Sequence, residues 1–123
     1  MLFRSLVTDL VGEKLNERFV RGVLDEVSPR RGFGLLTPEV DRYVLYCTEP
    51  VPSAALDGAL RANLHYAYAR DLGQLAAPVV VRVTGNPAAH YLEECLRRGQ
   101  RLGDIKVSAL HRQGGWGQVF ERT

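Results

Sequence analysis

Polar side chains at helical spacing are the first candidates for chemistry in this sequence. Asn63, Tyr66 and Arg70 stand at positions i, i+3 and i+7, so they share one flank of an expected helix. A polar row beside an apolar stripe either docks a partner domain or anchors neighbouring groups within its own domain. The intradomain, structural role is the simpler interpretation.

Basic side chains are the second group of candidates. Lys106 follows the Leu102-Gly103 turn at the start of an expected strand. A lysine is a compact, mobile positive charge that can stabilise developing negative charge, although a solvated lysine at a strand edge explains the same spacing. Arg97, Arg98 and Arg101 cluster at the end of an expected helix. The helix dipole favours them there, and a phosphate contact by Arg101 is the functional alternative.

The remaining reactive side chains give no catalytic or metal-binding pattern. His65, His90 and His111 lie far apart without ligand-like spacing, so we expect no metal site. Cys47 and Cys95 have no CxxC partner, which is typical of reduced core thiols in a cytoplasmic protein.

The elements that must position these residues follow from hydrophobic periodicity and turn signals. We expect strands at residues 2–10, 34–37, 42–48, 78–84 and 105–110, and helices at 13–27, 54–72 and from the Asn86-Pro87 start to Gly99. Helices between strands predict an α/β (α+β) two-layer sandwich, with a mixed sheet of about four to five strands flanked by three helices.

Each expected helix has a predicted inner face, and the strand at 78–84 is expected to be buried. Ser53 is the expected cap of the second helix, and Asn86 with Pro87 begins the third. The predicted inner faces are Leu15, Phe19, Val20, Val23, Leu24 and Val27 in the first helix, Leu56, Leu60, Leu64 and Tyr68 in the second, and Ala89, Leu92, Cys95 and Leu96 in the third.

Size and charge narrow the function classes. The 123 residues suit one domain, and 46% hydrophobic residues can form one core. A net charge of +2 does not suggest a nucleic-acid-binding protein. The longest apolar runs, such as residues 78–81, are far shorter than the roughly 20 residues of a membrane-spanning helix, so no membrane partner is expected.

Three segments, in order, resemble the C-terminal domain of the auxin-responsive Gretchen Hagen family of acyl-acid amido synthetases. The first is similar to the family's G-E-K-L-x-E turn, the second to its helix pattern L-D-x-x-L-x-x-N-x-x-Y-x-x-x-R, and the third to a helix-ending glycine followed by a lysine. These segments are Gly12-Glu13-Lys14-Leu15-Asn16-Glu17, residues 56–70, and residues 99–106. Near the lysine the chain departs from the family at Asp104, Ile105 and Ser108.

The resemblance implies an adenylate-forming ligase. In such enzymes a large N-terminal domain binds ATP, Mg²⁺ and the acyl acid, and a small domain rotates over it between adenylation and attack by an amino acid. It implies that Lys106 is catalytic, that Gly12, Glu13 and Lys14 form a loop facing the substrate or nucleotide, and that residues 1–12 contain the hinge. Residues 13–123 would then be the cap domain, inactive alone and with no cofactor bound to it.

Two hypotheses from other functional classes remain open. A non-catalytic binding or regulatory module of similar shape could dimerise through an exposed sheet edge. Such a module would bury its apolar surface within itself or in a symmetric dimer, whereas a cap separated from its large domain would leave an apolar or basic patch uncovered. A weak RNA-binding sandwich ranks last because Tyr43 and Tyr46 point to opposite faces of their strand.

Overall fold

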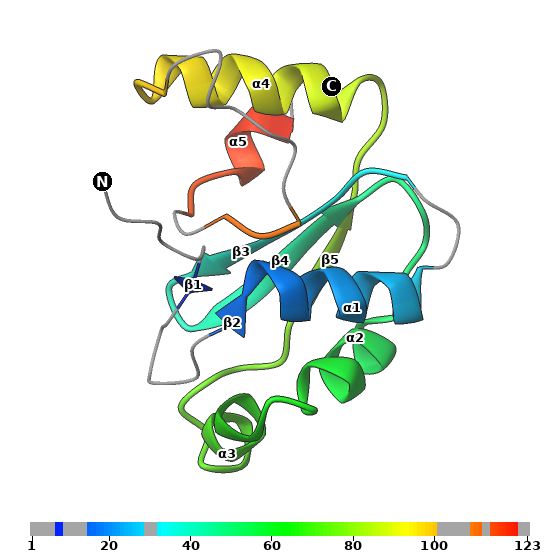
Figure 1. The fold of residues 1–123 in the computed structure, drawn as a ribbon, viewed down its shortest axis with the longest axis vertical. Coiled ribbons are helices and arrows are strands. Elements are labelled where there is room, and N and C mark those ends of the chain that lie inside the picture. Colours follow the sequence, from blue (N-terminus) through cyan, green and yellow to red (C-terminus); the bar gives the residue numbers. More distant parts are fainter. Residues whose placement is uncertain (1–6, 9–14, 29–31, 101–108, 112–113, 121–123) are drawn as a thin grey trace.

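The structure is a computed structural model that describes residues 7–8, 15–28, 32–100, 109–111 and 114–120. The chain is α+β, as predicted, with a mixed sheet and several helices (Figure 1). The strands are β1 (Val7–Thr8), β2 (Leu15–Asn16), β3 (Gly34–Glu39), β4 (Arg42–Cys47) and β5 (Val79–Arg82). The helices are α1 (Glu17–Val27), α2 (Ser53–Leu60), α3 (Leu64–Asp71), α4 (Pro87–Arg97) and α5 (Gly117–Phe120).

Among the described residues, the main sheet has three strands in the order β3-β4-β5, fewer than the four to five strands predicted. β3 and β4 form an antiparallel hairpin, whereas β5 runs parallel to β4. Of the expected first strand at 2–10, the structure describes residues 7–8, which form β1 and pair with β2 in a separate two-stranded sheet. Of the expected last strand, Leu110 makes a single parallel bridge to Leu36, and residues 105–108 lie outside the described residues.

Helices cover both faces of this sheet, rather than forming the single helical layer of a two-layer sandwich (Figure 1). On one face, α1, α2 and α3 pack over the alternate residues Leu36, Tyr43, Leu45 and Cys47. On the other face, α4 and α5 pack over Leu35, Val44 and Tyr46. Strand residues alternate between faces, and because both faces are covered, β4 is buried along most of its length.

Helix α1 follows the predicted stripe but begins later than residue 13. Its cap is Asn16, whose side-chain oxygen accepts a hydrogen bond from the Phe19 amide at 2.8 Å. Leu15 and Asn16 form β2 instead of helix, and residues 13–14 lie outside the described residues. Val20 and Val23 are buried as expected.

The predicted single helix at 54–72 is wrong, because the chain forms α2 and α3 with a break at residues 61–63. Leu56 and Leu60 are buried as predicted, but Leu64 and Tyr68 are 80% and 65% exposed. Helix α3 has its own N-cap at Asn63, and it packs Tyr66 and Ala69 against the core instead of Leu64 and Tyr68. The prediction of Ser53 as a cap is also wrong, since Ser53 is the first residue of α2 and its hydroxyl donates to the Pro78 carbonyl.

Two further predictions of burial need correction. β5 is an edge strand in which Val79 and Val81 are exposed, so the expected buried strand is covered only in part. Helix α4 begins at Pro87 with Asn86 as its cap, as predicted, and the chain turns at Gly99 with φ of 95°. Cys95 is buried as predicted, but Tyr91 and Glu94 are buried beside it, whereas Leu96 is 42% exposed. None of the described helices is long and apolar enough to cross a membrane.

Candidate functional site

The residues assigned to catalysis from the sequence cannot be placed. Lys106, Arg101, Gly12, Glu13 and Lys14 all lie outside the described residues. The structure does describe the residues that border these segments and the polar row on the second predicted helix. These neighbouring residues and the polar row make up the candidate site.

Glu17 links helix α1 to a segment far along the chain. Its side chain accepts hydrogen bonds from the backbone amides of Ala109 and Leu110, each at 3.0 Å, and it also pairs with Arg21 at 2.6 Å. The acceptor comes from the first turn of α1, and the donors lie 92 and 93 residues further along the chain. Through Leu110, the same segment reaches β3. Glu17 thus fixes the backbone immediately after the segment that contains Lys106.

Asp57 binds the polar row of the second motif. The carboxylate accepts from the Tyr66 hydroxyl at 2.8 Å, from Arg70 Nε at 2.9 Å and from Arg61 Nε at 3.2 Å. Arg70 also donates to the carbonyl of Leu75 at 3.1 Å. These contacts tie α2 to α3 across the break and to the loop that follows. They are all contacts within this chain.

Asn63 belongs to the same motif, but it acts as the N-cap of α3. Its side-chain oxygen accepts from the Tyr66 amide at 2.9 Å and so caps α3. The sequence predicted one shared flank for Asn63, Tyr66 and Arg70, whereas the structure gathers only Tyr66 and Arg70 at Asp57.

Electrostatics keep this cluster ionised. Partial burial raises the pKa of Asp57, but hydrogen bonds from Arg70, Tyr66 and Arg61 more than offset this effect, so the pKa lies below its ordinary value. Burial, followed by the hydrogen bond to Asp57, raises the pKa of Tyr66 well above its ordinary value. Tyr66 therefore stays protonated at neutral pH and remains a hydrogen-bond donor, which suits a structural cluster more than a catalytic one.

The arginines at the end of α4 face a buried carboxylate. Glu94 is 3% exposed and binds both Arg97 and Arg98, the latter at 2.7 Å. The hydrogen bond from Arg97 lowers the pKa of Glu94 to about 2, with a further contribution from Arg98. Arg98 also lies over the Trp116 ring, 4.4 Å from its centroid. Because Glu94 neutralises part of this positive charge, the described end of α4 is a poor match for ATP phosphates.

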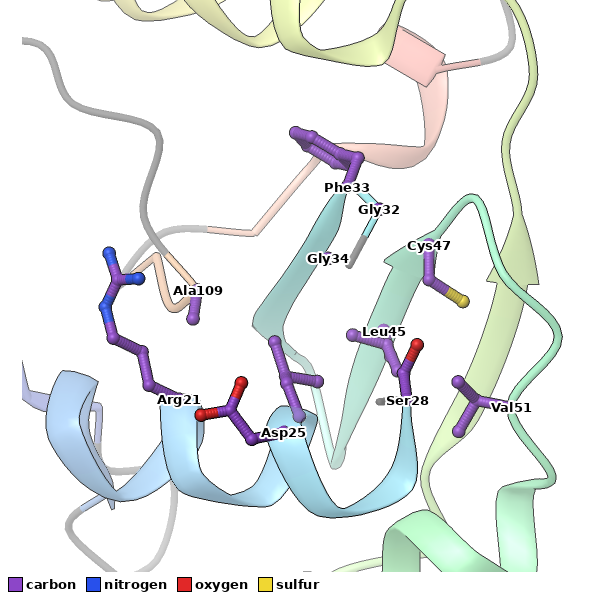
Figure 2. A pocket seen from close by; sticks show the side chains of 11 residues that line it. Arg21, Asp25, Ser28, Gly32, Phe33, Gly34, Leu45, Cys47, Val51 and Ala109 are labelled. Carbon is purple, nitrogen blue, oxygen red and sulfur yellow. The ribbon is translucent and has the colours of Figure 1, made fainter. Parts of the chain in front are cut away.

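A pocket of about 310 Å³ opens between α1 and the sheet (Figure 2). Its floor is buried and apolar, and its rim carries the charged side chains of Arg21 and Asp25. Burial raises the pKa of the Cys47 thiol in the floor, so this thiol is neutral at physiological pH. The lining residues are Arg21, Leu24, Asp25, Ser28, Gly32, Phe33, Gly34, Leu45, Cys47, Val51 and Ala109.

Within the described part of the chain, no group of three His, Cys, Asp or Glu side chains is arranged to hold a metal ion. Comparison with models of known protein families finds no match to this chain, and a search of curated proteins finds no similar sequence either. Any functional assignment therefore rests on the residues and contacts described above.

Sequence reasoning missed the three acidic residues that organise these contacts. Glu94 stands three and four residues before its arginines, a spacing that signals helix ion pairs. Arg61 and Arg21 follow Asp57 and Glu17 by four residues, which is also a helix ion-pair spacing. Arg70 lies thirteen residues after Asp57, and the amides that bind Glu17 lie 92 and 93 residues further along the chain, so no local spacing predicted these partners. The pocket also joins residues from distant parts of the sequence, and it too was not predicted.

Proposed function

We propose that this chain is the mobile C-terminal cap domain of an ATP-dependent acyl-acid amido synthetase. A large N-terminal adenylating domain would bind ATP, Mg²⁺ and the acyl acid in the cytoplasm. The cap would bring Lys106 to the junction where the carboxylate attacks the α-phosphorus, and there its positive charge would stabilise the developing negative charge. After rotation about the segment at residues 4–9, the Gly12-Glu13-Lys14 turn would face the acyl adenylate during attack by an amino acid.

The contact between Glu17 and the amides of Ala109 and Leu110 is the observation that carries this proposal. Glu17 ends the first segment of the resemblance, and Ala109 follows the third. A lid that delivers a lysine from a loop needs a fixed point beside that loop. A carboxylate that accepts hydrogen bonds from two backbone amides and pairs with one arginine provides such a point.

The exposed apolar residues of α3 give independent support. Leu64, Tyr68 and Leu72 recur every four residues, so they line one side of the helix, and they are 80%, 65% and 54% exposed. In the part of the chain that the structure describes, nothing covers this stripe. An uncovered apolar stripe is what a cap separated from its large domain would leave, since contiguous exposed apolar surface usually marks an interface.

The test is the variant Lys106→Ala in a protein that contains both domains. We expect ATP–pyrophosphate exchange to fall by roughly 10²–10³-fold, the scale for loss of a preorganised charge at a reaction centre. The control is Arg18→Ala, an exposed basic residue of α1 for which we expect no change. Unchanged exchange in the Lys106 variant would remove this lysine from the reaction. The isolated 123-residue chain should fold and show no exchange.

The alternative function is a stand-alone, non-catalytic module that dimerises. The open edge of β5, with exposed Val79 and Val81, favours it, because edge strands pair readily with a second chain. Analytical ultracentrifugation of the isolated chain separates the two proposals. A stable dimer at micromolar concentration would favour the module, and a monomer would favour the cap.

A further inference from the structure

The pocket between α1 and the sheet has the build of a small-molecule site. Its volume of about 310 Å³ is at the lower end of the range for ligand pockets. Leu45, Cys47 and Val51 form a buried apolar floor (Figure 2). This floor suits an apolar group no larger than a branched aliphatic or small aromatic side chain.

The rim restricts the charge of the ligand. Arg21 and Asp25 both rise from α1 toward β3, one helical turn apart (Figure 2). A simple anion attracted by Arg21 would be repelled by Asp25, and a simple cation attracted by Asp25 would be repelled by Arg21. A molecule with both charges satisfies both side chains.

Both charged groups have binding capacity in addition to their present contacts. Glu17 contacts Arg21 at Nε, and a guanidinium has further N–H donors on its two Nη atoms. An ionised carboxylate such as that of Asp25 accepts several hydrogen bonds, so it can keep its own contact and still bind an ammonium group. Ser28, at the C-cap of α1, adds a hydroxyl group to the same rim.

We propose that this pocket binds a free α-amino acid with an apolar side chain. The carboxylate lies against Arg21, the ammonium group against Asp25, and the side chain on the floor formed by Leu45 and Val51. This inference does not depend on the proposed function, because the pocket lies within this chain alone. If the proposed function also holds, the ligand belongs to the class of molecule that accepts the acyl group.

Methyl and amide NMR titrations of the 123-residue chain test the inference. The probes are L-leucine, isovalerate and isoamylamine, which share the branched apolar group but carry both charges, the negative charge or the positive charge. We expect saturable shifts at Leu45 and Val51 with L-leucine, and at least about tenfold weaker binding of either singly charged analogue, since each loses one charge-assisted hydrogen bond. No saturable shift with L-leucine, or equal affinity for an analogue, would overturn the proposal.

Charge variants give a second readout. Arg21→Gln should weaken L-leucine and isovalerate by about tenfold and leave isoamylamine unchanged, whereas Asp25→Asn should weaken L-leucine and isoamylamine and spare isovalerate. Arg18→Gln and Glu26→Gln are matched controls, because both residues are exposed on α1 and do not line the pocket. Equal weakening by a control and its partner would contradict the site. Failure here leaves the exchange assay of Lys106→Ala unaffected, so the two proposals fail separately.

Discussion

At the scale of single residues, three carboxylates that carry no catalytic signature organise the described contacts. Glu17, Asp57 and Glu94 each bind donors from more than one residue. A carboxylate that is at least partly buried needs such partners, because an uncompensated charge away from water is costly. The sequence reading concentrated on basic residues and on Tyr66, and so it identified the donors of these clusters but not their acceptors.

Tyr66→Phe tests the Asp57 cluster. The variant keeps the buried ring, which is 1% exposed, and removes only the hydroxyl that donates to Asp57. We expect a loss of about 1–2 kcal/mol in the free energy of unfolding, measured by urea denaturation, because the acceptor is charged. Tyr68→Phe is the control on the same helix, since Tyr68 is 65% exposed, and it should change stability by less than about 0.5 kcal/mol. Equal effects of the two variants would refute the structural role of the hydroxyl.

Glu94 makes a prediction about pH. Its pKa in the folded chain is about 2, below the ordinary value of 4.5, so the ionised form stabilises the fold. This stabilisation is complete above pH 4.5 and is lost as the pH falls toward 2. Glu94→Gln should therefore lower stability at pH 7 by roughly 2–3 kcal/mol and flatten the decline between the two pKa values. The exposed neighbour Glu93→Gln should retain the wild-type pH profile in thermal unfolding. An unchanged profile for the Glu94 variant would show that its ion pairs with the two arginines do not contribute to stability.

At the scale of elements, the sequence predicted helices and strands correctly where capping residues and hydrophobic periodicity indicated the same boundaries. The stripe of α1, the strands expected at residues 34–37 and 42–48, and the Asn86-Pro87 start of α4 are all confirmed. The prediction failed at residues 54–72, where leucines recurring every four residues suggested one helix. The same stretch holds Asn63, an N-cap residue that starts a second helix in a new direction. The burial of β5 was also misjudged, because composition does not reveal which strand lies at the edge of a sheet. The buried face of α4 was misjudged as well, since it includes a charged residue, Glu94, that pairs with arginines.

Asn63→Ala tests the importance of that break. The alanine removes the acceptor of the Tyr66 amide at the first turn of α3. We expect a loss of about 1 kcal/mol in the free energy of unfolding, typical of a lost N-cap, and faster amide hydrogen exchange at the start of α3. His65→Ala is the matched control, since His65 is exposed in the same turn. Unchanged exchange at Tyr66 in the Asn63 variant would show that the cap does not hold the helix.

At the scale of the whole molecule, the sheet separates two cores with different connections. The core under α1 and α2 includes Ala109 and Leu110, which Glu17 ties to α1. The core under α4 holds Trp116, stacked on Tyr91 with ring centroids 5.0 Å apart. The residues after 108 therefore contribute to both cores. Such long-range closure is invisible to sequence periodicity, which explains why the fold class was predicted but the helical layers on both faces were not.

The exposed stripe of α3 carries the prediction that best separates a cap from a self-contained module. Leu64→Ser combined with Leu72→Ser should change the unfolding free energy of the isolated chain by less than about 0.5 kcal/mol per site, because both side chains are already mostly exposed. In a protein with both domains, the rate of amide formation should fall by roughly 30-fold or more, since each apolar side chain removed from a docked surface costs about 1–2 kcal/mol and the variant removes both leucines. Leu96→Ser is the control, an exposed leucine on α4. If the isolated wild-type chain is instead a dimer that the double variant dissociates, the stripe joins two copies of this chain and the module replaces the cap.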